Sequence, residues 1–342
     1  MKIPKKLQTG DTVAIISPSF AGPNIFHDRY AAGCKQLEAA FGVCPISMKH
    51  TFITPKKSMK HPELRAQDLM DAFKNPDVKA IIASIGWEDS IRLLPYIDFN
   101  IIQNNPKILL GYSDITILHF MCYYAWLRSY YGPTIMAWFA ENNGIFPYMQ
   151  QSLQKTLFSD EKIGKITANS SGWTNEFLDW THPQNQQISR KLQPSQPWKI
   201  LQKWKKNSFS GKLLWGCLDT FYFLWETKIW PKKDDWKGKI LFFELSEENM
   251  PVDMFRRIIR SLGVQEILQN LNGILVGRYP NENDYNETLL QVIQQEFWLY
   301  NLPIITNMDF GHTDPMFTIP IGAEAKFWCD SMTLEILESW VL

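Results

Sequence analysis

An alternation of short apolar runs with helix-like patterns in the first part of the chain most constrains its fold. Val13 to Ser17, Lys79 to Ile85 and Lys107 to Leu110 are short, apolar and mostly rich in β-branched residues. Between the first two, Pro62 to Phe73 places Leu, Met and Phe near helical spacing. Alternating strands and helices are typical of a mostly parallel sheet covered by helices. We therefore predict an α/β fold for this part of the chain.

A change of pattern divides the chain further along. Between about Asp160 and Trp204 the periodic segments give way to polar residues with scattered tryptophans, which favours a boundary or a long excursion there. At about 150 residues per domain, the 342 residues are enough for two domains. We predict an N-terminal α/β domain in residues 1–150, a connecting segment with a substrate loop in 151–210, and a C-terminal α/β domain in 211–342.

The C-terminal part has its own strand and helix signals. Lys239 to Phe243, Gly273 to Val276 and Pro303 to Thr306 are short apolar runs that indicate buried strands. Pro251 to Leu262 indicates a helix with proline in its first turn. Residues 323–338 alternate in the manner of closing antiparallel strands. Together these signals predict a mixed sheet.

Composition excludes several classes of partner. Lysine plus arginine and aspartate plus glutamate each total 35, so net charge gives no global attraction for nucleic acid or an anionic membrane. The five cysteines are scattered without a C-x-x-C pair, which indicates reduced thiols in the cytosol and no zinc site. The longest apolar stretch, Ile108 to Leu127, contains Ser113, Asp114 and His119 and is a poor membrane span. The N-terminus has no signal-peptide pattern, so we expect a soluble cytoplasmic protein.

Ser113 lies at a predicted turn between a buried strand and a helix. A serine in such a turn has its hydroxyl exposed above the sheet, and the next backbone N–H points to where a reacting oxygen would lie. The sequence from Gly111 to Ile115 lacks the second glycine of the G-x-S-x-G pattern. From the residues alone, Ser113 is either a nucleophile or the N-cap of the following helix.

A serine nucleophile needs a base and an acid that orients it. Among six histidines, His312 lies in a loop after a predicted strand, whereas His119 lies in the apolar helix and is expected to be packed. Glu244 ends the apolar run from Ile240 to Phe243, where a carboxylate is costly to bury unless it is paired. A structural loop histidine and a salt bridge from Glu244 to an arginine are the alternative interpretations.

A set of short motifs, in order along nearly the whole chain, resembles the serine LD-carboxypeptidase (muramoyltetrapeptide carboxypeptidase) family. They are Gly10 to Val13, Ser17 to Ser19, Gly111 to Asp114, Tyr131 to Pro133, Phe243 to Glu248, Val276 to Arg278 and Phe310 to Thr313. Three further runs resemble the microcin C self-immunity (MccF-like) branch of that family. They are Ser84 to Gly86, Leu93 to Asp98 and Ser246 to Pro251.

The resemblance implies two α/β domains, the first with a flavodoxin- or Rossmann-like parallel sheet and the second with a mixed sheet. The active site is then expected in the cleft between them, in a cytoplasmic homodimer that needs no metal or other cofactor. It also implies a triad in which Ser113 attacks the carbonyl, His312 takes and returns the proton, and Glu244 holds the ring. Backbone N–H groups of Trp87 and Asp114 are expected to stabilise the developing oxyanion.

Two segments depart from the pattern of the family, and both bear on the substrate. Trp87 follows Gly86, where the family commonly has a second glycine. Trp215 to Cys217 lies where the family tends to have a glycine pair and an asparagine. Gly86 and Trp180 are the expected substrate-binding residues. Trp173 and Trp180 lie in the polar excursion, where a tryptophan either stacks on a flat group such as a nucleobase or anchors the loop.

The sequence thus predicts a serine peptidase that hydrolyses an amide bond through an acyl-enzyme. The expected substrate is a peptidyl- or aminoacyl-nucleotide, and the alternative is a murein tetrapeptide in cell-wall recycling. A non-catalytic binding protein on the same fold is a further alternative, suggested by the two departures. A phosphate-loop nucleotide-binding protein is disfavoured because neither G-x-G-x-x-G nor G-x-x-x-x-G-K-[ST] occurs.

Overall fold

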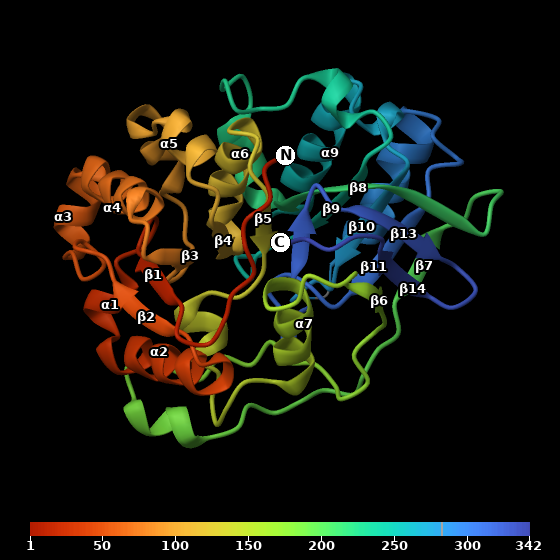
Figure 1. Ribbon diagram of the computed structural model, residues 1–342. Coiled ribbons are helices and arrows are strands. Elements are labelled where there is room, and N and C mark those ends of the chain that lie inside the picture. Colours follow the sequence, from red (N-terminus) through yellow and green to blue (C-terminus); the bar gives the residue numbers. More distant parts are fainter. Residues whose placement is uncertain (282) are drawn as a thin grey trace.

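The computed structural model describes residues 1–281 and 283–342, which form two sheets with helices packed against them (Figure 1). The N-terminal sheet has six strands in the order β12-β5-β4-β3-β1-β2. Their bounds are β1 Thr12–Ile16, β2 Cys44–Ser47, β3 Val78–Ala83, β4 Ile108–Gly111, β5 Ser129–Tyr131 and β12 Ile319–Ile321. β1 to β5 pair in parallel and β12 is antiparallel to β5. The predicted parallel sheet is confirmed, and β1, β3 and β4 overlap the three predicted strands.

Helices cover this sheet on both faces, with α2 below the strands and α4 and α5 above them in Figure 1. The helices of this part are α1 Gly22–Ile25, α2 His27–Phe41, α3 Pro55–Lys60, α4 Pro62–Lys74, α5 Phe99–Asn104, α6 Thr116–Tyr124 and α7 Pro147–Leu157. α4 matches the predicted helix: Pro62 occupies its first turn, and Leu69, Met70 and Phe73 are buried. A proline is favoured there because the first N–H groups of a helix have no partner within it.

The C-terminal sheet has eight strands in the order β6-β14-β13-β8-β9-β10-β11-β7. Their bounds are β6 Gly164–Ile166, β7 Lys199–Gln202, β8 Ser208–Cys217, β9 Ile240–Glu244, β10 Gly273–Gly277, β11 Ile304–Met308, β13 Glu324–Trp328 and β14 Thr333–Ile336. β8 to β11 are parallel, and antiparallel strands flank them on both sides. Helices α8 Phe221–Leu224, α9 Val252–Val264 and α10 Tyr285–Leu290 belong to this part. The predicted mixed sheet is confirmed.

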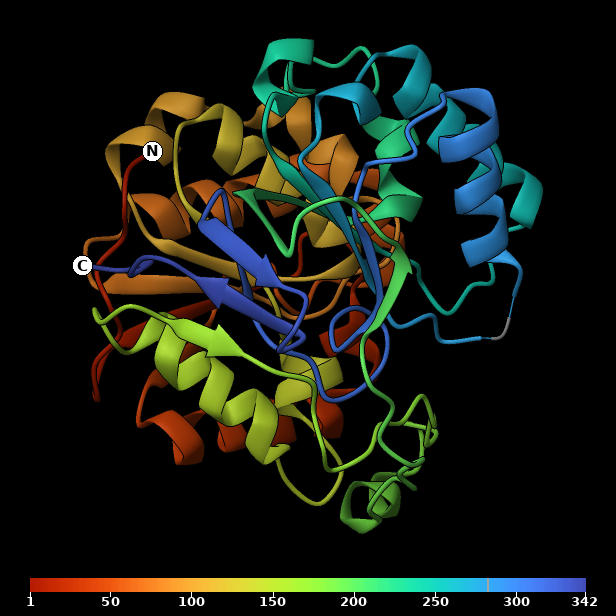
Figure 2. The ribbon, with the colours of Figure 1, turned by 90° about the vertical axis from the view of Figure 1, so that its right-hand side faces the viewer.

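Each sheet includes strands that come from a distant part of the chain. β12 comes late in the chain and pairs with β5 of the N-terminal sheet, whereas β6 and β7 come from the segment before β8 and pair at the two edges of the C-terminal sheet. Figure 2 shows β6 beside the C-terminal strands and the loop between β6 and β7 extending below the sheets. Part of this loop, the 3-10 helix η4 (Pro183–Gln187), lies against α2. The loop is therefore fixed to both parts of the molecule.

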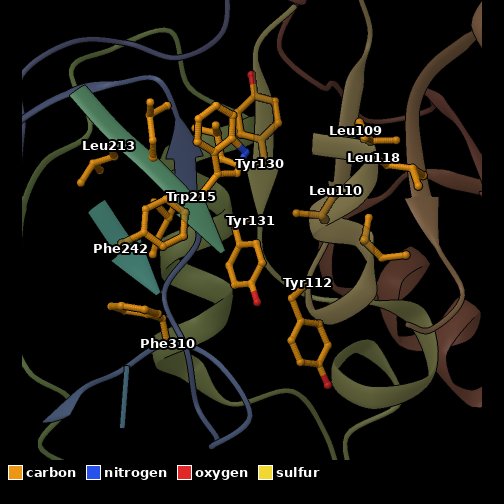
Figure 3. Close-up of a cluster of buried hydrophobic side chains, with 14 of the residues drawn as sticks. Leu109, Leu110, Tyr112, Leu118, Tyr130, Tyr131, Leu213, Trp215, Phe242 and Phe310 are labelled. Carbon is orange, nitrogen blue, oxygen red and sulfur yellow. The ribbon is translucent and has the colours of Figure 1, made fainter. Parts of the chain in front are cut away.

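Aromatic side chains fill the space between the sheets (Figure 3). The ring of Trp215 stacks on Phe120 of α6, with centroids 4.0 Å apart, and both are buried. Tyr131 packs edge-on against Phe242 of β9. Trp215, one of the two departures from the family pattern, is therefore a core residue that joins β8 to α6. Among the described residues, no helix has both the length and the apolar character needed to span a membrane.

Candidate active site

Ser113 follows β4 in a sharp turn that leads into α6. Its φ is +62°, in the left-handed region that costs a non-glycine residue about 1–3 kcal/mol. A Cβ atom at Gly111 would lie 2.8 Å from Cγ2 of Ile115, so the turn is too tight for a side chain there. The N-cap of α6 is Ile115. The N-cap alternative for Ser113 is therefore wrong.

His119 has a structural role, as expected. It is fully buried in α6, and its Nε2–H donates to the carbonyl of Gly111 at 2.9 Å. Burial lowers the pKa of His119 to about 4, so the ring is neutral. Its hydrogen bond holds the end of β4 that precedes Ser113.

Glu244 and His312 form a buried pair. Glu244 ends β9 with no exposed surface, and Nδ1–H of His312 donates to its Oε2 at 2.6 Å. The hydroxyl of Tyr131, in β5, donates to the other carboxylate oxygen and accepts the backbone N–H of Ser113 at 3.1 Å. Glu244 thus pairs with a histidine and not with an arginine. Tyr131 links this carboxylate to the backbone of Ser113.

Two glycines make room for Glu244. A Cβ atom at Gly277 would lie 2.7 Å from Cβ of Glu244, and one at Gly311 would lie 2.7 Å from its Oε2. Gly311 also has φ +102°, which only glycine adopts readily. These contacts give a physical reason for the glycines in Val276 to Arg278 and Phe310 to Thr313.

Charges around His312 favour the protonated form of its ring. Burial lowers the pKa of His312, but the charges of Glu244 and Glu247 outweigh it and raise the pKa from 6.5 to about 10. Burial raises the pKa of Glu244, but the His312 charge and the hydrogen bonds from His312 and Tyr131 hold it below its ordinary value. Nε2, the other nitrogen of His312, faces Oε2 of Glu247 at 3.5 Å.

Ser113 and His312 line one cavity of about 600 Å³. Among the described residues, no hydrogen bond joins the Ser113 hydroxyl to His312, whose Nε2 faces Glu247 instead. Catalytic hydrogen bonds are often long or absent without substrate. Two residues of the predicted triad, Ser113 and His312, therefore line one cavity, and Glu244 is buried beside it and bonded to His312.

Gly86, in the loop after β3, lets this loop lie against Ser113. A Cβ atom at Gly86 would lie 3.1 Å from the Ser113 hydroxyl oxygen and 3.3 Å from the backbone nitrogen of Asp114, so this loop passes directly beside the nucleophile. The buried Asp114 carboxylate accepts the Ser19 hydroxyl at 2.6 Å and the Ser90 N–H at 2.9 Å. Ser90 lies at the end of this loop and Ser19 in the loop after β1, so Asp114 ties both loops to the turn that carries Ser113.

Trp87, the first departure, has φ +154°, which explains why glycine suits this position. Its indole stacks on Phe20 with centroids 5.1 Å apart and is 57% exposed at the mouth of the cavity. The bulky side chain thus has room outside the reacting centre.

The two loop tryptophans have different surroundings. Trp173 is buried and lies under the guanidinium of Arg278, 5.1 Å from the ring centroid, so it anchors the loop. Trp180 lines the cavity, packs edge-on against Phe26 and lies under the guanidinium of Arg29 at 4.9 Å. Only Trp180 is placed to contact a ligand.

One cluster combines three side chains of metal-binding type. Cys217, Glu244 and His312 each offer a ligand atom, and these atoms lie within 4.8 Å of one another. Burial, followed by the charges of Glu244 and Asp219, raises the pKa of the Cys217 thiol well above its ordinary range, which disfavours the thiolate that a metal requires. Glu244 and His312 are also bonded to each other, so the cluster suits acid–base chemistry better than a metal.

Sequence reasoning missed several residues of the site. Tyr131 connects Ser113 to Glu244, and Arg190 forms ion pairs with Glu141 and Asp314. These contacts join segments more than a hundred residues apart or lie in a loop without periodicity. The family motif from Tyr131 to Pro133 marked this position in the sequence, but gave no role for the tyrosine.

Comparison with known proteins agrees with this architecture. Residues 13–132 match the model of the LD-carboxypeptidase N-terminal domain and residues 210–327 that of the C-terminal domain. The chain is 30% identical to YocD of Bacillus subtilis, over 97% of both chains. It is 27% identical to an MccF-like protein of Streptococcus pneumoniae solved with AMP, covering 97% of this chain and 99% of that one, with a TM-score of 0.87.

The microcin C7 self-immunity protein MccF of Escherichia coli is a third relative. It is 25% identical over 98% of this chain and 95% of its own length. Its structure with aspartyl sulfamoyl adenosine has a TM-score of 0.84 and covers 100% of both chains. On the two family matches and this full-length similarity, the protein belongs to the LD-carboxypeptidase family of serine hydrolases.

Proposed function

We propose that this protein hydrolyses the amide bond of aminoacyl- or peptidyl-nucleotides with Ser113, His312 and Glu244 as its catalytic triad. The observation that carries the proposal is the single cavity that Ser113 shares with His312, whose ring is held by the buried Glu244. A cytoplasmic homodimer, as the resemblance implies, is part of this proposal.

In the proposed reaction, the Ser113 hydroxyl oxygen attacks the carbonyl carbon while its proton passes to Nε2 of His312. His312 returns the proton to the nitrogen as the C–N bond breaks, which leaves an acyl group on Ser113. Water then hydrolyses this ester by the same proton route. Glu244 stabilises the imidazolium in both steps, and the N–H groups of Trp87 and Asp114 meet the oxyanion.

Aromatic side chains support a nucleotide as the leaving group. Among the lining residues, Trp180 packs against Phe26 and Phe177, and Phe20 stacks on Trp87. Aromatic rings bind bases by stacking at about 1–3 kcal/mol per base. Relatives solved with AMP and with aspartyl sulfamoyl adenosine point to the same ligand class.

A mass-spectrometric turnover assay tests the proposal. Purified protein and its Ser113→Ala variant are incubated separately with aspartyl, alanyl and lysyl sulfamoyl adenosine and with a murein tetrapeptide that ends in D-alanine. Cleavage of any nucleoside conjugate by the wild type alone is the expected result. Cleavage of the tetrapeptide alone would replace the proposed substrate with a murein peptide. Cleavage of neither, with tight binding of a conjugate, would indicate a binding protein.

A further inference from the structure

Four carboxylates line the cavity close to one another: Glu88, Asp219, Glu247 and Glu248. Burial raises the pKa of Glu248, and the charges of the other three add to the increase, so the four groups repel one another. Within residues 1–281 and 283–342, the only ion pair that any of them makes is that of Glu247 with His312. This side of the cavity therefore carries negative charge without a matching cation.

The cationic side chains of the same cavity are occupied. Arg190 is paired with both Glu141 and Asp314. Arg29 donates to the Met136 carbonyl at 2.8 Å and to Asn142 at 2.7 Å. Both arginines also belong to the part of the cavity near Trp180 and the loop, so they leave the four carboxylates unneutralised.

Glu247 lies against the atom that the reaction needs. Its Oε2 faces Nε2 of His312 at 3.5 Å, and the side chain is 69% exposed, whereas His312 is held on its other side by the buried Glu244. A carboxylate at this position stabilises the proton on Nε2. The ring then cannot accept the proton of Ser113 until Glu247 moves or is neutralised.

On the basis of the function proposed above, we propose that Glu247 and Glu248 select substrates whose acyl group carries a positively charged amino group on its side chain. Pairing with that group draws Glu247 from Nε2 of His312 and frees the base as the substrate binds. An acidic acyl side chain would instead add to the repulsion among the carboxylates. Glu247 is thus a specificity-determining and positioning residue, and not a member of the triad.

Other groups around His312 fit this assignment. Glu244, Asp219, Asp314, Glu248 and the ring of Tyr112 face His312 besides Glu247. Glu244 is buried and fixed by two hydrogen bonds, and Asp314 is paired with Arg190. Asp219 accepts the N–H and hydroxyl of Ser246 at 3.0 and 3.1 Å. Glu247 is therefore the carboxylate at Nε2 that is exposed and able to exchange His312 for a ligand.

The test compares lysyl sulfamoyl adenosine with its Nε-acetyl form and with the aspartyl compound. The wild type is expected to show a kcat/KM up to about fivefold higher for the lysyl than for the acetylated compound, in line with an ion pair to a partly exposed carboxylate. Glu247→Gln and Glu248→Gln should each reduce this ratio. Glu38→Gln, an exposed site on α2, is the matched control and should keep the ratio.

Calorimetry on the Ser113→Ala protein measures the Kd of each compound without turnover. The ratio of the Kd values for the acetylated and lysyl compounds then gives the selection at the binding step. Equal rates and affinities for the two lysyl compounds, or fastest cleavage of the aspartyl compound, would overturn the charge selection and leave the proposed reaction intact. Neither cleavage nor binding of any nucleoside conjugate would overturn the proposed function and, with it, this inference.

Discussion

The acid–base pair is fixed in the packed core, whereas aromatic side chains of the cavity, such as Trp87 and Phe177, lie on exposed loops. Glu244 is buried, lies between Gly277 and Gly311, and is bonded to His312 and Tyr131. Trp87 and Phe177 lie on loops and are 57% and 68% exposed. Groups that must stand at fixed distances from the reacting atoms are set by core packing, whereas groups that recognise a ligand lie on loops. We therefore expect large, all-or-none effects from the first region and graded effects from the second.

Ser113→Ala should have the largest effect, because it removes the proposed nucleophile without disturbing the packed acid–base pair. A loss of about 10³-fold or more in kcat is expected, with an unchanged unfolding temperature. Turnover measured beside thermal unfolding checks this. Near wild-type activity in the purified variant would contradict the proposed role of Ser113.

Glu244→Gln should reduce kcat by about 10²- to 10⁴-fold and change the pH dependence of stability. The folded state raises the pKa of His312 from 6.5 to about 10. The protonated ring therefore stabilises the fold fully below pH 6.5, and this contribution is lost as pH rises through about 10. Denaturant titrations between these pH values should show a smaller decline for the variant than for the wild type. Parallel curves would mean that His312 is not held by this charge.

Gly311→Ala should cost about 1–3 kcal/mol in unfolding free energy and about a hundredfold in kcat, because its Cβ would strike Glu244. Gly144→Ala separates this contact from backbone strain. Gly144 has φ +111° but no atom within 4 Å of such a Cβ, so its variant should lose stability and keep its activity. An equal loss of activity in the two variants would mean that backbone strain, and not the contact with Glu244, causes the loss.

Trp180→Ala should raise KM for nucleoside conjugates by about tenfold, in line with the loss of one stacking contact. A murein tetrapeptide, which has no base to stack, serves as the comparison substrate. An equal loss on both substrates would make Trp180 a loop anchor, like Trp173.

Trp87→Gly should have the smallest effect on turnover, because the backbone N–H remains. The substitution removes an exposed indole whose ring contact is the stacking on Phe20. Since φ is +154°, the Trp87→Gly variant should have an unfolding free energy about 1 kcal/mol higher than that of the Trp87→Ala variant. Denaturant unfolding of the two variants measures this difference. An alanine variant at least as stable as the glycine variant would show that this backbone is not strained.

The sequence was informative where chemistry coincides with a local pattern. Ser113 lies at a strand–turn–helix junction, Glu244 ends an apolar strand and His312 follows one, and each could be found from its immediate neighbours. Tyr131 and Glu247 lie in family motifs, but their roles could not be found, because these arise from contacts with Glu244 and His312, which are far away in sequence. Trp215 was marked as a departure, but only the packed structure shows it stacked on Phe120 in the core.

The fold class and the family were predictable because alternating strands and motif order follow directly from the chain. The strands that each sheet takes from a distant part of the chain were not, because pairing of β12 with β5 or of β6 with β14 depends on partners far away in sequence. Strands as short as β5, β6 and β12, with three residues each, carry almost no periodic signal of their own.

The late position of β12 also has a consequence for synthesis on the ribosome. β5 carries Tyr131, and its outer edge is paired only with residues 319–321. While these residues are still in the exit tunnel, the nascent N-terminal sheet exposes an unpaired edge that can add a strand from a neighbouring chain. The sheet can therefore be completed only after residues 319–321 have left the exit tunnel.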